Sequence, residues 1–156
     1  MITIEYPTNP EQVLEVLNHP KVYKKVRDDL SLRNYKPNVD STIFLVIKNN
    51  GVLCGVVGIT PFISASCQLH IALLPAIYGK RGEVAASIRG WVLMNTRYLK
   101  FFCIIPTYNK LAIHFAKRCG FKEEGLLTKL FLRDWKLHDM IILGITREEW
   151  RCQGQQ

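Results

Sequence analysis

The stretch over 67–121 constrains the fold of this chain more than any other. Two short apolar runs, over 67–75 and 101–105, each end at a proline or immediately before one. A segment with helical spacing, over 84–98, separates them, and a further helix is expected over 109–119, closed by a glycine. A strand, a crossover helix and a second strand form a βαβ unit, so we expect the two strands to be parallel neighbours.

The turn between the first of these strands and its helix carries residue types that favour a phosphate. It reads IYGKRGEV over 77–84 and leads into the helix, where free backbone N–H groups and the positive end of the helix dipole attract an anion. The net charge of the chain is +8, and the stretch 78–118 holds eight basic residues against one acidic residue. Because nearly all the excess charge lies there, the sequence predicts a phosphate-bearing ligand; a solvated basic face is the alternative.

The other segments predict a mixed α/β fold of about seven strands and about four helices, in the order β-α-α-β-β-β-α-β-α-β-β. The clearest of them is a hairpin around Asn49-Asn50-Gly51, because Asn-Gly supplies the positive φ of a tight turn. The remaining elements are a strand over 2–6, helices over 10–17 and 21–30, a polar loop over 34–40, hairpin strands over 42–48 and 52–60, and closing strands over 122–133 and 138–145.

Length and composition bound the class of protein. At 156 residues we expect one domain over 1–150 and a polar tail over 151–156, with the polar stretch 147–156 fraying. No apolar run approaches the roughly 20 residues of a membrane span, and the N-terminus lacks the parts of a signal peptide. The five cysteines lack C-x-x-C spacing and predict free thiols in a reducing, cytoplasmic compartment. The histidines lack ligand spacing, so no metal site is expected.

Three segments resemble a known family. The segment PTYNKLAIHFAKRCGFKEEG (106–125) resembles the Asn-x-x-Ala…Gly-Phe…Glu-Gly segment of the GNAT superfamily of N-acyltransferases. The segment 71–85 is similar to the acyl-CoA pyrophosphate loop of that superfamily. The segment 134–150 resembles the closing strand and tail of the branch related to ribosomal-protein N-terminal acetyltransferases, and the resemblance is greatest to bacteriophage-encoded members.

The resemblance implies the GNAT fold, an acyl-CoA donor, usually acetyl-CoA, and direct attack by a primary amine. In that fold the fourth and fifth strands splay, and the pantetheine arm lies in the gap. The diphosphate would lie against the 79–84 loop. Asn109 matches a motif position that contacts the pantetheine, and its alternative role as a helix N-cap is compatible with that contact. The cofactor-binding residues that the resemblance implies are Leu73, Leu74, Gly79, Lys80, Arg81, Gly82, Glu83, Val84, Asn109 and Lys117.

The sequence departs from the family pattern at two places. The usual loop is Arg/Gln-x-x-Gly-x-Gly/Ala, whereas here the pattern is shifted by one residue, with Arg81 and Ala85 as the candidate substitutes. Many members also place a tyrosine four residues after the motif alanine, where it protonates the leaving thiolate, and Ala116 stands at that position. The thiol of coenzyme A is acidic enough for its thiolate to leave unassisted, so the change removes the usual general acid without abolishing activity.

Two residues are candidates on the acceptor side. His70 lies on the strand beside the proposed thioester and would act as general base; a partly buried, structurally satisfied histidine is the alternative. Asp28 lies with Asp29 at the end of the predicted helix over 21–30, whose inward face includes Leu30. In the GNAT fold that region borders the acceptor site, so Asp28 would read a cationic substrate; a solvated acidic helix end is the alternative.

Two rival functions stay open. One is a GNAT-fold protein with weak or lost catalysis that serves in phage assembly or binding, which the altered loop and Ala116 favour. The other is a nucleic-acid-binding module on the basic face, which lacks a recognition motif. The expected partners are an acyl-CoA and an unidentified amine, with phage virion or host proteins under the rival reading. No membrane is expected, and the chain is a monomer or homodimer.

Overall fold

We describe the protein from a computed structural model, which covers residues 1–30 and 41–155; the predicted loop over 34–40 lies outside them. The elements are β1 (Ile2–Glu5), α1 (Pro10–Leu17), α2 (Pro20–Val26), β2 (Ile43–Asn49), β3 (Val52–Pro61), β4 (Ser66–Leu73), the 3₁₀-helix η1 (Pro75–Lys80), α3 (Arg81–Asn95), β5 (Lys100–Pro106), α4 (Lys110–Arg118), β6 (Lys122–Arg133), β7 (Lys136–Thr146), α5 (Arg147–Cys152) and the 3₁₀-helix η2 (Gln153–Gln155).

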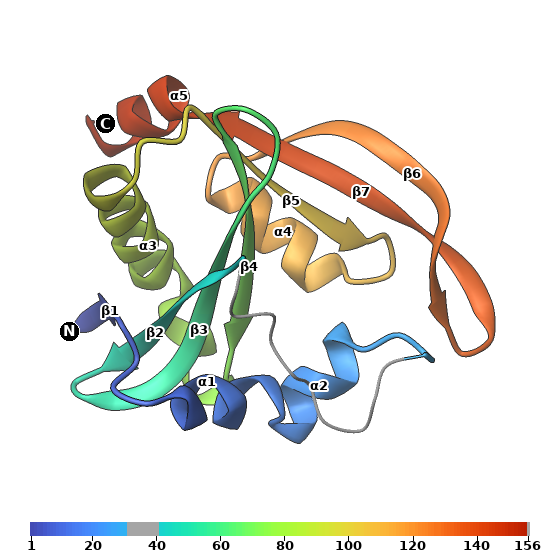
Figure 1. The fold of residues 1–156 in the computed structure, drawn as a ribbon, viewed down its shortest axis with the longest axis horizontal. Coiled ribbons are helices and arrows are strands. Elements are labelled where there is room, and N and C mark those ends of the chain that lie inside the picture. The colour runs from blue at the N-terminus through green and yellow to red at the C-terminus, as the bar shows by residue number, and fades with distance from the viewer. Residues whose placement is uncertain (31–40, 156) are drawn as a thin grey trace.

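A single seven-stranded sheet runs through the molecule in the order β1-β2-β3-β4-β5-β7-β6 (Figure 1). Each neighbouring pair is antiparallel apart from β4 and β5, which are parallel as the βαβ pattern predicts. The order of strands and of the first four helices is the predicted one, so the mixed α/β fold class is confirmed. The described residues add a fifth α-helix at the C-terminal end.

The β2–β3 hairpin turns at the predicted place. Asn50 and Gly51 have φ values of 50° and 82°. Two residues in the left-handed region give the turn a twist that matches the twist of the flanking strands. The hairpin places β3 in the middle of the sheet, with β4 and the rest of the chain on its far side.

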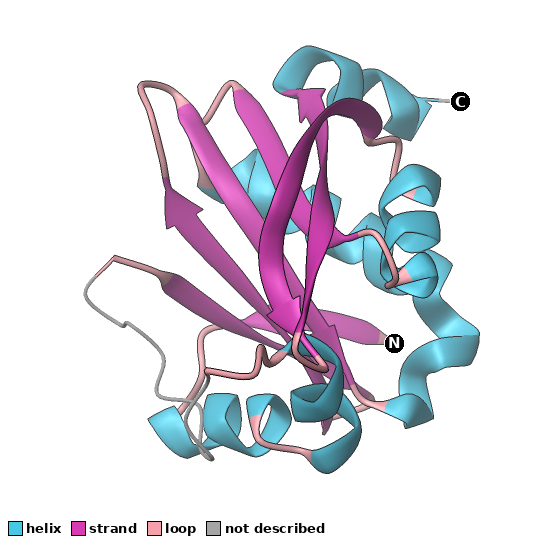
Figure 2. Cartoon of the chain, turned by 90° about the vertical axis from the view of Figure 1, so that its right-hand side faces the viewer, coloured by secondary structure: helices cyan, strands magenta, loops and turns pink. Residues whose placement is uncertain are grey.

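Helices cover both faces of the twisted sheet (Figure 2). The larger core cluster joins α3, α4 and α5 to one face, and its members include Val84, Ile113 and Trp150. A smaller cluster joins α1 and α2 to the other face through Val13 and Val22. Because successive side chains of a strand point to opposite faces, each central strand contributes to both clusters. β4 therefore lies between the two helical layers.

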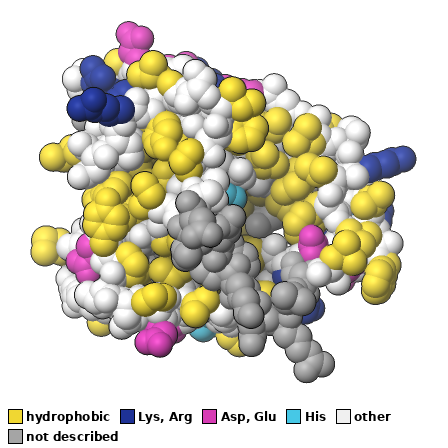
Figure 3. Space-filling view, viewed as in Figure 1, with side chains coloured by type: hydrophobic (Ala, Val, Ile, Leu, Met, Phe, Trp, Pro, Cys, Tyr) yellow, Lys and Arg dark blue, Asp and Glu magenta, His cyan; other side chains and the backbone are white. Residues whose placement is uncertain are grey.

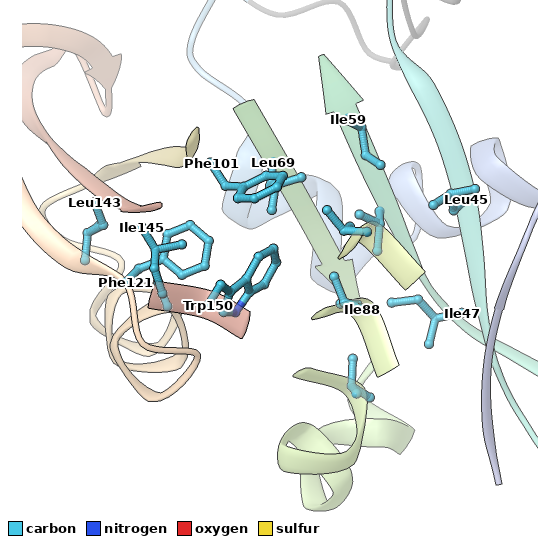
Figure 4. Close-up of a cluster of buried hydrophobic side chains, with 14 of the residues drawn as sticks. Leu45, Ile47, Ile59, Leu69, Ile88, Phe101, Phe121, Leu143, Ile145 and Trp150 are labelled. Carbon is cyan, nitrogen blue, oxygen red and sulfur yellow. The ribbon is translucent and has the colours of Figure 1, made fainter. Parts of the chain in front are cut away.

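Helix α5 corrects the prediction that the stretch 147–156 frays, because residues 147–152 are helical. Its N-terminus is fixed by a capping box in which Thr146 and Glu149 satisfy each other's backbone N–H groups. Trp150 is only 2% exposed, with its ring centroid 5.0 Å from that of Phe101 and 5.4 Å from that of Phe121 (Figure 4). Burial of this ring holds the polar segment in place.

Arg147 ties α5 to the end of α3. Its guanidinium donates hydrogen bonds to the backbone carbonyls of Leu93, Thr96 and Tyr98, at 2.5, 2.8 and 2.9 Å. The last carbonyls of a helix have no partner within the helix, so a cation at this end is favourable. α3 ends at Asn95, three residues earlier than predicted, because Thr96 is extended and its hydroxyl donates to the carbonyl of Val92.

Helix α2 is shorter than predicted. It ends at Val26, and Leu30, predicted to face inward, is 75% exposed. The chain leaves the helix because the segment after it bonds to the β6–β7 hairpin. The N–H of Asp29 donates to the carbonyl of Leu132 at 3.0 Å, and its carboxylate accepts the N–H groups of residues 134 and 135 at 3.1 and 2.7 Å.

The outer strand β6 forms an exposed edge of the sheet. Most of its residues are exposed, among them Leu126 and Leu130, and exposed apolar side chains spread over the face in Figure 3. The strand is interrupted where Lys129 adopts a φ of 52°, and its N–H there donates to a carboxylate oxygen of Asp139 at 2.8 Å. An irregular edge of this kind discourages pairing with another strand.

Candidate active site

The parallel pairing of β4 and β5 stops halfway along the strands. The paired residues are Ser66 with Lys100, Cys67 with Phe101 and Gln68 with Phe102. Both strands continue beyond this point, β4 to Leu73 and β5 to Pro106, and they diverge (Figure 1). The carboxyl halves of the two strands therefore border a gap in the sheet, where the GNAT resemblance places the pantetheine arm.

The backbone groups of alternate β4 residues face this gap. The carbonyl of Ala65 accepts the N–H of Leu99, just before β5, whereas the N–H of Leu74 donates to the carbonyl of Cys54 on β3. Alternation along the strand then turns the N–H groups of Ile71 and Leu73 toward the gap. The carbonyl of Leu74 accepts the N–H of residue 77, so both backbone groups of Leu74 are already bonded. Of the two residues that the resemblance named, Leu73 offers a backbone donor.

The predicted phosphate loop is a helix start. Residues 79 and 80 close η1, and Arg81, Gly82 and Glu83 form the first turn of α3. No side chain of residues 1–30 or 41–155 caps this turn, whereas α1, α2, α4 and α5 each receive a side-chain cap. The first amides of a helix lack partners within the helix, and with the helix dipole they favour an anion. The uncapped start of α3 suits a phosphate.

A pocket of about 190 Å³ lies between α3 and α4. Among the described residues it is lined by three arginines and by no carboxylate, and the first turn of α3 contributes Gly82 to its wall. The lining residues are Arg81, Gly82, Ala85, Ala86, Arg89, Leu111, His114, Phe115, Arg118, Cys119 and Trp150. Two arginines of one helix and one of the other thus converge on a hollow that borders the start of α3.

The structure changes the set of cations next to this pocket. Lys117, which the resemblance implied, lies outside the lining and pairs with Glu123 at 2.6 Å. The neighbouring Arg118 lines the pocket instead, and so does Arg89, which sequence reasoning missed. Gly79 and Lys80 are not part of the lining either. Val84 packs its side chain into the core, so only its backbone is available to a ligand.

Asn109 caps α4. Its Oδ1 accepts the N–H of Ala112 at 3.3 Å, and it follows the end of β5 by three residues. The N-cap alternative is therefore confirmed. The same position borders the open end of the gap, so a pantetheine contact stays a prediction.

The structure draws attention to Tyr108, two residues after the end of β5. Its hydroxyl is buried and has no hydrogen-bond partner among the described residues. Its ring lies 5.0 Å from the ring of His138, and the guanidinium of Arg133 lies over it at 5.5 Å. Leaving a buried hydroxyl unpaired costs about 1–3 kcal/mol, and native proteins rarely do so without a reason. The signal in the sequence was its place directly before the α4 cap.

His70 lies on the face of β4 that also carries Ala72, toward α1 and α2. Atoms packed around the imidazole displace water and lower the pKa of His70 below its ordinary value of 6.5, although the side chain keeps solvent contact. A lowered pKa keeps the ring neutral at pH 7, which a general base requires.

We expect the lowered pKa of His70 to weaken the fold in acid. The unfolded chain takes up this proton first, so the free energy of unfolding falls as the pH drops below about 6.5 and levels off below the native pKa. His70→Gln should reduce that fall, as followed by urea unfolding at several pH values. His114→Gln, on the exposed face of α4, is the control. An unchanged pH dependence in His70→Gln would contradict the assignment.

The acidic residues after α2 have structural bonds. A carboxylate oxygen of Asp28 accepts the N–H of Leu30 at 3.0 Å, and both oxygens of Asp29 accept hairpin N–H groups. The predicted acidic helix end is wrong, because the helix stops at Val26. A role for Asp28 toward a substrate stays a prediction.

Three of the cysteines are poor nucleophiles. Burial raises the pKa of Cys67, Cys103 and Cys119 to about 12, even though Arg89 and Arg118 oppose the shift at the last of these. The thiolate is the reactive form, so these three residues stay protonated and inert. The described residues hold no group of three His, Cys, Asp or Glu side chains that could bind a metal ion. In the same part of the chain no helix is long and apolar enough to cross a membrane.

Comparisons with solved structures identify proteins of the same fold. No protein-family model and no curated protein matches the sequence. Among solved structures, the chain is similar to spermidine N-acetyltransferase from Vibrio cholerae in complex with CoA and spermine, with a TM-score of 0.78 and 16% identity over 96% of this chain and 98% of that chain. Mutant forms of the spermidine/spermine N-acetyltransferase from the same organism match with a TM-score of 0.76 and 16% identity over 98% of both chains. The chain therefore has the GNAT fold.

Proposed function

We propose that the protein is an N-acetyltransferase that moves the acetyl group of acetyl-CoA to a primary amine. The observation that carries the proposal is the gap between β4 and β5, because its free strand edge leads directly into the uncapped start of α3 and the arginine-lined pocket. A strand edge for an amide-containing arm and a cationic pocket for phosphates are the two parts that an acyl-CoA needs.

Two groups of residues would bind CoA, one the pantetheine arm and the other the diphosphate. The N–H and carbonyl groups of Ile71 and Leu73 pair with the pantetheine amides, as a neighbouring strand would. The first-turn amides of α3 hold the diphosphate, with Arg81, Arg89 and Arg118 supplying charge-assisted hydrogen bonds. The structural neighbour crystallised with CoA and spermine has the same fold, which supports this arrangement.

The chemistry follows from the groups at the gap. An amine must lose a proton before it attacks the thioester, and neutral His70 takes it, directly or through water. The amides of β4 that face the gap stabilise the oxyanion. Ala116 is buried in the core and cannot protonate the thiolate. The unpaired hydroxyl of Tyr108, at the end of β5, is the candidate donor in its place.

A second function is a GNAT-fold protein with weak or lost catalysis that serves in phage assembly or binding. Ala116 at the usual acid position favours it. The phage-encoded origin, the relation to ribosomal-protein acetyltransferases and the host cytoplasm as location remain predictions from the resemblance. The acceptor-site position of Asp28 and the pantetheine contact of Asn109 belong with them.

Calorimetric titration of acetyl-CoA into the purified protein tests the proposal. We expect saturable binding in the micromolar range, followed by release of CoA thiol when a mixture of primary amines is added. Binding without any turnover would favour the assembly role. No binding at millimolar acetyl-CoA would contradict both the cofactor site and the enzyme. A heat-denatured sample is the control for non-specific heats.

A further inference from the structure

A second pocket, of about 370 Å³, is lined in part by η1 and, among the described residues, shares no lining residue with the pocket between α3 and α4. Its walls come from α2, from the segment after β4 and from the end of β6. The lining residues are Lys21, Lys24, Lys25, Pro75, Tyr78 and Arg133. Four of the six carry a positive charge, so we call it the cationic pocket.

Within residues 1–30 and 41–155, nothing neutralises the charges of the cationic pocket. In those ranges no carboxylate lines it, and none of its four basic side chains forms an ion pair. The ion pairs of the described chain use other lysines, such as Lys48 with Glu5. Of the two acids after α2, Asp28 accepts the N–H of Leu30 and Asp29 accepts the hairpin N–H groups. Like charges gathered in a concave surface raise the local concentration of anions.

The cationic pocket lies beside the ends of both diverging strands. Pro75 follows the last residue of β4 by two positions. Arg133 lies over the ring of Tyr108, which follows the last residue of β5 by two positions. The pocket is thus on the side of the gap that faces α2, whereas the arginine-lined pocket lies between α3 and α4. A molecule held in it has its remaining atoms close to the open end of the gap.

Two of the cations are held in position by neutral groups. The Nζ of Lys25 donates to the hydroxyl of Tyr78 at 3.0 Å and lies 5.1 Å from the centre of that ring. The guanidinium of Arg133 donates to the carbonyl of Arg27 at 3.4 Å and lies over an aromatic ring. Side chains that are already ordered lose less freedom when an anion arrives.

We infer that the acceptor is an amine that carries an anionic group, a phosphate or a carboxylate, and that the cationic pocket holds that group. The inference rests on the proposed function and names its substrate class. A polyamine is cationic along its length and is repelled by four positive charges that pair with no carboxylate of the described residues, so it is disfavoured here. In this respect the chain differs from the structural neighbours, whose names give spermidine or spermine as substrates.

The test compares acceptors that differ in charge. With acetyl-CoA as donor, kcat/KM is measured for O-phosphoethanolamine, β-alanine, ethanolamine and spermidine. We expect one of the two anionic amines to exceed ethanolamine and spermidine by about tenfold or more, with the advantage shrinking as salt is added. The better of the two shows whether the pocket prefers a phosphate or a carboxylate.

Lys24→Gln/Lys25→Gln tests the pocket itself. We expect kcat/KM for the anionic amine to fall by about tenfold, with the Kd of acetyl-CoA unchanged, which also reports that the variant is folded. Arg97→Gln/Arg151→Gln removes the same charge from two exposed sites outside both pockets and should leave both constants unchanged.

Three other outcomes would contradict the inference, and they can be told apart. Preference for spermidine or ethanolamine, with acetyl-CoA binding intact, overturns the inference and leaves the proposed function in place. A loss of acetyl-CoA affinity in the lysine variant also overturns it, because the pocket would then hold the phosphates of CoA. If the unmodified protein does not bind acetyl-CoA at all, the proposed function is wrong and the inference falls with it.

Discussion

Trp150→Ala lowers the free energy of unfolding by about 3–5 kcal/mol, the range for removing a large aromatic side chain from a packed core. The indole is 2% exposed and lies between the rings of Phe101 and Phe121. Without it α5 loses the anchor that joins it to the sheet. Because Trp150 also lines the arginine pocket, the affinity for acetyl-CoA should fall as well. Urea unfolding followed by far-UV circular dichroism measures the first effect.

The matched control is Trp135→Ala. That side chain lies in the β6–β7 turn and is 81% exposed, so its removal should change stability by no more than about 0.5 kcal/mol. Equal effects of the two substitutions would show that α5 is not part of the cooperative core. A loss confined to Trp150 supports the packing described here.

Arg81→Ala/Arg89→Ala is expected to raise the Kd of acetyl-CoA by about 100-fold or more, because each charge-assisted hydrogen bond to a phosphate contributes about 1.5–3 kcal/mol and two are lost. Both side chains line the pocket at the start of α3. Isothermal titration gives the Kd directly. Stability should change little, since neither arginine is paired with a carboxylate in the described chain.

Lys117→Ala tests whether Lys117 binds the cofactor, as predicted from the sequence, or lies outside the binding pocket, as in the structure. Lys117 pairs with Glu123 away from the pocket, so its loss should change the Kd by no more than about twofold. An effect of Lys117 larger than that of the arginine pair would place the phosphates on the outer face of α4. The phosphate site proposed here would then be wrong.

Local sequence patterns were sufficient for most of the fold. The alternation of apolar residues and the Asn50-Gly51 turn specify the hairpin without help from distant residues. Helix α5 was not predicted because its composition is polar. The sequence does contain a helix-start motif, since Thr146 and Glu149 have the spacing of a capping box. Burial of one tryptophan is enough to hold this polar helix against the core, and the average composition of the segment does not reveal that contribution.

The end of α2 could not be predicted from nearby residues. The apolar spacing of Val22, Val26 and Leu30 continues past the point where the helix stops. What ends it is the bonding of Asp29 to a hairpin more than 100 positions later in the chain. Tertiary contacts of this kind override local propensity.

The sequence predicted the type of ligand at the candidate site but not all of the residues that line it. The turn before α3 and the local excess of basic residues pointed to phosphate binding, but the choice of cations depends on which helix faces meet. Arg81 and Arg89 are eight positions apart, so they share one face of α3. Tertiary packing orients this face toward α4. Neighbouring residues of a helix point about 100° apart, and here Arg118 lines the pocket whereas Lys117 pairs with Glu123.

The bond between Asp29 and the β6–β7 turn also sets an order of assembly. The two partners are 105 and 106 positions apart, so the segment after α2 is synthesised long before the turn that fixes it. Closing so long a loop is slow and follows the formation of local structure. On a ribosome, α1, α2 and the β2–β3 hairpin can form early, whereas the wall around the cationic pocket is completed only when nearly the whole chain has emerged.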